Sequence, residues 1–258
     1  MSSQSGAEAE RRPAVPPGCN HLVVKLNAAA ALSDDDKRAV NDLCSRVRTI
    51  AAKQDIIGEG DKPDHVHVMM EGWAARYKIV GDGGRQITAF LIPGDFCDLH
   101  VTILGEMDHG ILALTPTKVA YVPHKVMEEL PRERPELVRA LWWATLVDEA
   151  VLRSWIVNIG RREAAERVAH LFCELHARMK LVGLVEDDQF DLPLTQEVIA
   201  DALGLTPVHV NRMLQRLRSD GLIQLGGGEL TILDIAGLRR LADFDPNYLH
   251  RGRLARDD

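Results

Sequence analysis

The sequence predicts an α+β protein in three parts: an N-terminal β-roll, a long helix and a C-terminal winged helix-turn-helix. From Arg48 to Pro123, short apolar runs alternate with glycine-rich turns at roughly ten-residue intervals, as expected for an all-β roll. Residues 136–159 repeat apolar side chains at helical spacing. Residues 194–218 show the spacing of two short helices joined by a tight turn.

Length, charge and cysteine content limit the class of protein. A chain of 258 residues is long enough for one large domain or two smaller ones, each with its own core. The net charge of −7 does not favour a nucleic-acid binder, but a whole-chain value can hide a basic face on an acidic body. The four cysteines are scattered without a Cys-x-x-Cys pair, which argues against a disulfide framework and a zinc finger.

The sequence also indicates where the protein works. No apolar window approaches the roughly twenty residues of a membrane span, so no membrane partner is expected. Ser, Gly, Glu, Arg and Pro dominate residues 1–18, so we expect residues 1–20 to be a disordered tail and not a signal peptide. These observations predict a protein of the reducing cytoplasm.

Ahead of the roll, Ser33 followed by three aspartates begins an amphipathic pattern that predicts a capped helix near residues 33–46. Within the roll, His65 and His67 alternate with valines, which places both histidines on one face of a strand. We expect that face to be exposed to solvent, opposite a valine core face. Half of a metal site is the alternative interpretation.

The long helix has an apolar stripe at four-three spacing, which is typical of a coiled-coil seam. The stripe consists of Leu137, Leu141, Ala144, Asp148, Val151 and Trp155. Other apolar side chains, such as Trp142 and Leu146, nearly encircle the helix, so it must be buried on more than one side. A β-roll on one side and the same helix of a second subunit on the other would bury it. The alternative is a helix buried within one chain.

The C-terminal pattern predicts a helix-turn-helix. Counting Gln196 as the first position, small Ala200 is fifth, where two helices approach closely, and Gly204 is ninth, where the turn needs a left-handed backbone. Val210 is fifteenth and contributes to the apolar contact between the helices. Thr206 is a plausible N-cap for the second helix.

The charge pattern of the second helix favours DNA binding over a structural helical hairpin. No acidic residue lies between Asp201 and Asp220, while arginines recur on one face. Two short apolar runs around Gly226–Gly228 then predict a wing, and Ile235–Ala242 a closing helix. The residues expected to contact phosphates or base edges are Thr195, Thr206, Pro207, His209, Asn211, Arg212, Gln215, Arg216 and Arg218.

Together these features resemble the Crp/Fnr family of bacterial transcription regulators, over residues 30 to 235. The most specific matches are Pro93-Gly94-Asp95 and residues 194–223. The resemblance implies a cyclic-nucleotide-binding-like double-stranded β-helix and a homodimer that binds a palindromic operator in double-stranded DNA. It also implies RNA polymerase as a partner if the protein is an activator. It places the family's base-contacting arginine on Arg212, whereas the accompanying glutamate would fall on Val208, which leaves the half-site sequence open.

This resemblance divides the chain into a disordered tail (1–20), a β-roll sensor domain (21–130), a dimerisation helix (131–159), a DNA-binding domain (160–245) and a second tail (246–258). The effector pocket is expected at the turn after the roll's Pro-Gly-Asp sequence. Its residues are Gly94, Asp95, Phe96, Cys97, Leu99, His100, His109 and Gly110. An effector there is expected to be neutral, apolar or metal-containing, unless the pocket is empty.

Cyclic AMP, cyclic GMP and an iron–sulfur cluster are all disfavoured as ligands. The cyclic-nucleotide members have a glutamate and an Arg-Ser or Arg-Thr pair after this turn, and both are missing here. Between Arg85 and Lys118 there is no Lys or Arg to neutralise a cyclic phosphate. Iron–sulfur members have clustered N-terminal cysteines, and Cys19 stands alone.

The competing class is a metal- or haem-binding β-barrel, either a sensor or an enzyme, with an accessory helical domain. Residues 95–109 contain Asp, Cys, His and Glu, which together include the usual metal ligands. Their spacing matches no recognised ligand motif, so no metal site is assigned. No phosphate loop, nucleophile elbow or His-Glu-x-x-His motif occurs, so no enzyme activity is expected.

Overall fold

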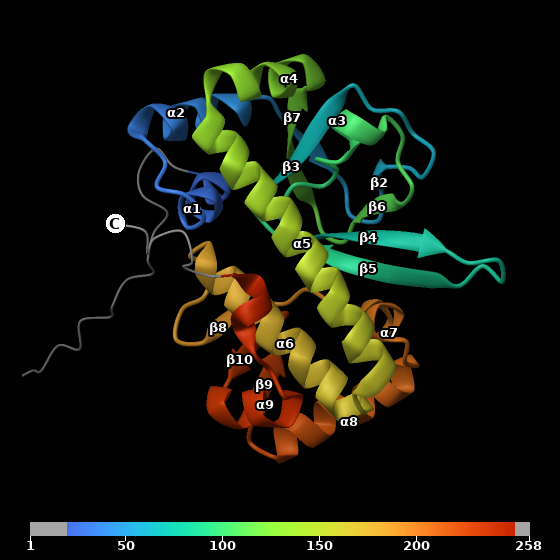
Figure 1. Ribbon diagram of the computed structural model, residues 1–258. Coiled ribbons are helices and arrows are strands. Elements are labelled where there is room, and N and C mark those ends of the chain that lie inside the picture. Colours follow the sequence, from blue (N-terminus) through green and yellow to red (C-terminus); the bar gives the residue numbers. More distant parts are fainter. Residues whose placement is uncertain (1–19, 251–258) are drawn as a thin grey trace, which may run out of the picture.

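The computed structural model describes residues 20–250 and has two units joined by one long helix (Figure 1). The roll and its flanking helices form one unit, and the C-terminal helices and short strands form the other. Helix α5 (Pro135–Arg161) runs diagonally along both units (Figure 1). Tails were expected at residues 1–20 and 246–258. Of these, residues 1–19 and 251–258 lie outside the described part of the chain.

The roll consists of two antiparallel sheets, as its turn spacing predicts. One sheet has the order β1-β7-β3, with β1 (Val47–Ile50), β7 (Thr117–Pro123) and β3 (His65–Glu71). The other has the order β2-β6-β4-β5, with β2 (Asp55–Ile57), β6 (Gly110–Ala113), β4 (Ala74–Ile79) and β5 (Arg85–Leu91). At Gly72, between β3 and β4, φ is +83° and a Cβ would lie 2.5 Å from the Pro116 carbonyl oxygen, so only glycine fits.

Four helices flank the strands of the roll. Helix α2 (Asp34–Leu43) confirms the predicted capped helix, with a capping box between Ser33 and Asp36. Helix α1 (His21–Asn27) was not predicted, because its seven residues are too few to show a helical period. Helices α3 (Val101–Leu104) and α4 (His124–Glu133) complete the unit; α4 covers the segment 131–133, where the sequence predicted the start of the long helix.

The predicted seam of α5 faces the chain's own core, so its assignment to a partner subunit was wrong. Leu137, Leu141, Ala144, Val151 and Trp155 are only 1–8% exposed. They pack against α1 and strands of the roll, and Asp148 forms an ion pair with Arg76 at 3.2 Å.

The stripe left exposed has the same four-three spacing but begins at Trp142, five residues after Leu137, which rotates it by about 140° around the helix. It consists of Trp142, Leu146, Glu149, Leu152, Arg153, Ile156 and Val157, and we call it the α5 outer stripe. Its apolar members are 39–72% exposed. Both stripes are apolar, so periodicity alone could not distinguish the side that packs against the roll.

The C-terminal unit begins with α6 (Ala164–Leu181) and contains a three-stranded sheet. Its elements are β8 (Gln189–Asp191), α7 (Gln196–Leu203), α8 (Pro207–Ser219), β9 (Ile223–Gly226), β10 (Glu229–Ile232), α9 (Ile235–Ala242) and the 3₁₀ helix η1 (Pro246–Leu249). Helix α9 has the predicted bounds. The tail predicted from 246 is corrected in part, because Leu249 is 3% exposed and η1 packs against α5.

The buried apolar residues form three clusters, and each contains one cysteine. The largest includes Cys173 and joins α6, the helix-turn-helix and part of the roll. The second includes Cys44 and lies between α1, α5 and the β1-β7-β3 sheet, and the third includes Cys97 inside the roll. All three thiols are buried and free.

A buried ionic network joins the two units. Asp95 accepts a hydrogen bond from Lys25 of α1 and another from Arg178 of α6, each at 2.7 Å. Burial alone would raise the pKa of Asp95, but the two cations hold it below its usual range. Arg178 also lies 3.4 Å from Glu174, which accepts a hydrogen bond from Trp155 of α5. In the described part of the chain, no helix is long and apolar enough to cross a membrane.

Candidate functional site

The helix-turn-helix has the local geometry that its sequence predicts. Thr195 caps α7 by accepting from the Val198 amide at 3.2 Å, and Thr206 caps α8 by accepting from the His209 amide at the same distance. Between the helices, Gly204 adopts the left-handed conformation, with φ +63° and ψ +41°. These three residues fix the angle at which α8 leaves the turn.

Helix α8 has one buried face and one polar face. Val210, Leu214 and Leu217 are at most 5% exposed and hold the helix on the unit. Most of the predicted DNA-contacting side chains here are exposed, namely Thr206, Pro207, Asn211, Arg212, Gln215, Arg216 and Arg218, whereas His209 is partly buried. Thr195 at the start of α7 is also exposed, and its neighbour Gln196 donates to the side chain of Asn211 on α8 at 3.4 Å.

The arginines of this face differ in their partners. Arg216 lies 3.7 Å from Asp220 in an exposed pair. Within residues 20–250, Arg212 and Arg218 form no ion pair, so their guanidinium groups keep their donors for another molecule. The expected wing is present as the β9–β10 hairpin, with Gly227 and Gly228 at positive φ in its turn. The face therefore combines free donors on α8 with an adjoining hairpin.

The roll contacts the helix-turn-helix through the β4–β5 hairpin. Arg85 at the start of β5 donates to Asp201 of α7 at 2.8 Å, and the side-chain Nε2 of Gln86 donates to the Ala202 carbonyl at 3.3 Å. In Figure 1 this hairpin extends above α7. The hairpin and the helix that precedes α8 are therefore joined by two hydrogen bonds.

Beside α5 the roll forms a pocket of about 490 Å³ that is open to solvent on one side, which we call the α5 cavity. Strand β4, the segment 96–109 and α5 supply most of its wall. The lining residues are Lys25, Arg76, Lys78, Thr88, Phe96, Leu99, His100, Leu104, Asp108, His109, Ala144, Thr145, Asp148, Glu149 and Leu152.

Four of the eight predicted pocket residues line this cavity: Phe96, Leu99, His100 and His109. The other four lie elsewhere for identifiable reasons. Asp95 is held in the buried ionic network, and burial raises the pKa of the Cys97 thiol well above its usual value. A Cβ on Gly94 would lie 2.8 Å from the His21 carbonyl oxygen, and one on Gly110 would lie 2.6 Å from the Tyr77 ring, so both glycines allow close packing.

The cavity wall contains three cationic side chains that lie outside the segment between Arg85 and Lys118, so the sequence of that segment did not predict them. Lys25, Arg76 and Lys78 come from α1 and β4, and each is already engaged. Lys25 pairs with Asp95 and Lys78 with Glu59. Arg76 donates to the carbonyls of Phe96 and Cys97 as well as to Asp148. The cavity thus contains positive charge that is neutralised within the chain.

The prediction for the β3 histidines was wrong for His67. His67 is 4% exposed and its Nδ1 lies 2.7 Å from Asp98, which is itself fully buried. The Asp98 carboxylate also accepts the His67 amide, so the pair joins β3 to the segment after Pro93-Gly94-Asp95. His65 is partly exposed and lies beside Asp64. Alternation indicated a shared face, but not that a carboxylate from a distant loop would cover it.

Models of two protein families match the chain. Residues 47–134 match a cyclic nucleotide-binding domain, and residues 166–241 match a Crp-like helix-turn-helix domain. The first covers the roll strands and α4, and the second covers α6 to α9. The matched segments therefore agree with the two units of the structure.

Two curated relatives match this chain over most of both sequences. The chain is 31% identical to the transcriptional activator protein FnrL of Cereibacter sphaeroides over 231 residues, 88% of this chain and 92% of FnrL. It is 29% identical to the nitrogen fixation regulation protein FixK of Bradyrhizobium diazoefficiens over 226 residues, 87% and 93% of the two chains. Among solved structures, FixK2 from Bradyrhizobium japonicum is similar with a TM-score of 0.69 and 27% identity, over 76% of this chain and 96% of that one.

Proposed function

Because this chain belongs to the Crp/Fnr family and is a DNA-binding transcription regulator, we propose that it acts as a homodimer that binds a palindromic operator through two copies of α8, with the α5 cavity as its effector site. The observation that supports this most directly is the exposed polar face of α8, where Arg212 and Arg218 have no ionic partner among the described residues. Guanidinium groups on such a helix can bind guanine edges and phosphates in the major groove.

The α5 outer stripe supports the homodimer. Trp142 is 63% exposed and Ile156 is 72% exposed, and both lie on one face of a 27-residue helix. Exposed apolar side chains in a continuous row are typical of a surface that a partner covers. A second copy of α5 would bury the row by coiled-coil packing, since its four-three spacing is that of a seam. Glu149 and Arg153, paired at 2.7 Å, would lie within the interface.

Two further partners follow from the proposal. An activator must recruit RNA polymerase, and FnrL is named a transcriptional activator; we therefore include RNA polymerase as a partner in activation. The protein would work in the cytoplasm, where it meets both DNA and polymerase. The named relatives are transcription regulators, which are not enzymes, so catalysis is not part of the proposal.

A genome-wide map of the DNA bound by the protein tests this function. We expect the bound sites to share a palindromic motif whose half-sites are separated by one helical turn, about 10 base pairs between centres. The Arg212→Ala variant should bind these sites more weakly and lose the preference at one position of each half-site, while Leu233→Ala, on the exposed loop before α9, should leave the map unchanged. Bound sites without a shared motif, or a map unchanged by Arg212→Ala, would contradict the proposal.

A further inference from the structure

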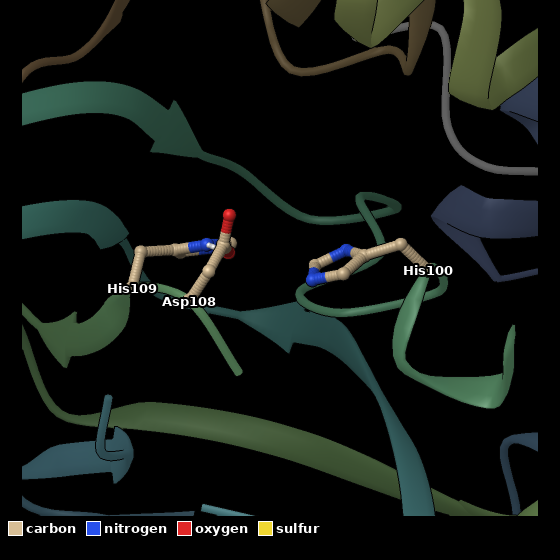
Figure 2. Close-up of side chains that lie close together, drawn as sticks. All are labelled: His100, Asp108 and His109. Carbon is tan, nitrogen blue, oxygen red and sulfur yellow. Dashed lines mark hydrogen bonds and ion pairs between the residues drawn. The ribbon is translucent and has the colours of Figure 1, made fainter. Parts of the chain in front are cut away.

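Three metal-ligating side chains meet in the wall of the α5 cavity. His100 immediately precedes α3, and Asp108 and His109 immediately precede β6. The segment between them folds back, so that one ligand atom from each residue lies within 4.8 Å of the other two. Figure 2 shows the His100 ring directed toward the Asp108 carboxylate and the His109 ring. The two imidazole centroids are 5.3 Å apart.

Two imidazole nitrogens of this triad, the buried Nε2 atoms of His100 and His109, have no hydrogen-bond partner among the described residues. Buried polar atoms nearly always find a partner, so two orphaned imidazole nitrogens on adjacent rings need an explanation. The Asp108 carboxylate lies 2.6 Å from Nδ1 of His109, so these two ligand groups now bond to each other, and an ion coordinated by both would take the place of that hydrogen bond.

The charged side chains of the cavity are largely paired within the chain. Lys25, Arg76 and Lys78 are each engaged by a carboxylate of the chain. The Nε2 atoms of His100 and His109 lack a partner among the described residues, and an imidazole nitrogen is a common ligand of transition-metal ions.

We propose that His100, Asp108 and His109 bind a divalent first-row transition-metal ion, and that this ion is the effector of the regulator. Two imidazoles and one carboxylate suit Fe²⁺, Co²⁺ or Zn²⁺, whereas Ca²⁺ and Mg²⁺ prefer sites made only of oxygen. Three protein ligands leave coordination positions open toward the cavity, where water or a small ligand completes the sphere.

Binding of an ion would fix the spacing of the three side chains. Two ligands of one ion lie roughly 3–4 Å apart, because each is about 2.1 Å from the metal. The three ligand atoms lie within 4.8 Å of one another, so an ion would hold the segment 100–109 in one arrangement. Thr145, Asp148 and Glu149 of α5 also line the cavity, so an ion there would act next to the helix that bears the outer stripe. This step rests on the proposed function of α5 in dimerisation.

The test uses full-length protein stripped with a chelator and then titrated with Zn²⁺ in competition with a chromophoric chelator. Wild type should bind one Zn²⁺ per chain, and His100→Ala and His109→Ala should each weaken binding by roughly 100-fold. His65→Ala is the matched control, because His65 also pairs with the preceding aspartate but lies outside the triad. Bound Co²⁺ should give visible absorption bands that His100→Ala removes. Circular dichroism shows whether each variant is folded. Asp108→Asn removes the negative charge but keeps the side chain's shape, and it should also weaken Zn²⁺ binding.

Operator binding separates this inference from the proposed function. Zn²⁺ should change operator affinity of the wild type and of His65→Ala, but not of His100→Ala. The metal inference would be overturned if the protein bound its operator but bound no Zn²⁺, or if the triad variants bound Zn²⁺ as tightly as the wild type. Either result would leave the regulator function intact. Bound Zn²⁺ without any effect on operator affinity would overturn its role as effector. Failure to bind any operator, with or without metal, would count against the proposed function itself.

Discussion

Arg178 of α6 donates to the Asp95 carboxylate at 2.7 Å, and so links the helix that leads into the DNA-binding unit to the turn that ends the β5 strand of the roll. Both side chains are largely buried. Asp95→Asn should lower the free energy of unfolding by about 3–5 kcal/mol, because it leaves the charge of Arg178 buried with a weaker partner. Urea denaturation measures this. Asp35→Asn, which breaks an exposed pair with Arg134, should leave unfolding nearly unchanged; equal effects of the two variants would show that the Asp95 network does not stabilise the fold.

The α5 outer stripe predicts a specific set of monomer-forming substitutions. Leu146→Glu combined with Ile156→Glu should give a folded monomer, because both side chains are exposed in the single chain and would be buried only in the proposed dimer. Sedimentation measures the mass, and circular dichroism the fold. Leu233→Glu, on an equally exposed leucine outside α5, should remain dimeric. By contrast, Leu141→Glu should unfold the chain, since Leu141 lies in its own core. A dimer that survives both stripe substitutions would refute the interface.

Arg212 and Arg218 should differ in their effect on DNA sequence preference. Arg212→Ala should cost roughly 1–3 kcal/mol on a matched operator and relax preference at one base pair. Arg218→Ala should weaken binding to all sequences alike and reduce its dependence on salt concentration, as expected for a phosphate contact. Titrations on matched and mismatched operators at two salt concentrations measure both effects. Equal losses on both operators for Arg212→Ala would exclude its role in base recognition.

Cyclic AMP and cyclic GMP should not bind at micromolar concentrations at pH 8. A cyclic phosphate needs a cation that is free to pair with it. Lys25, Arg76 and Lys78 each already pair with a carboxylate of the chain. Calorimetric titration at pH 8 checks this. Micromolar binding at pH 8 with a gain in operator affinity would contradict the prediction.

The fold should lose stability as the pH falls below 6.5, in part through His170. Burial lowers the pKa of His170 to about 4, whereas the unfolded side chain titrates near its ordinary value of 6.5. Between pH 4 and pH 6.5 the unfolded state binds one more proton at this residue than the folded state, so the free energy of unfolding decreases as the pH decreases. The loss from pH 7 to pH 5 through this residue is about 2 kcal/mol. Urea denaturation at both pH values should show a smaller loss for His170→Gln than for wild type, and an unchanged loss would contradict the assignment.

Local features of the site could be predicted from the sequence, and long-range contacts could not. The caps Thr195 and Thr206 and the turn residue Gly204 act within three or four residues, so the chain specifies them directly. The position of Lys25 near the cavity depends on packing of α1 against a roll some seventy residues away. The same limit explains the misplaced seam. Leu141 and Trp142 are adjacent apolar residues, and only the assembled roll determines which of them is buried.

One buried cysteine in each hydrophobic cluster makes the molecule suitable for thiol labelling. Burial raises the pKa of Cys44 to about 11 and that of Cys173 to about 12, and it raises the pKa of Cys97 well above its usual value. A thiol in this state reacts with a maleimide only when its surroundings open. In a Cys19→Ser background, the three reaction rates would therefore report separately how often each cluster opens. Such rates would show whether the roll and the DNA-binding unit open together or one before the other.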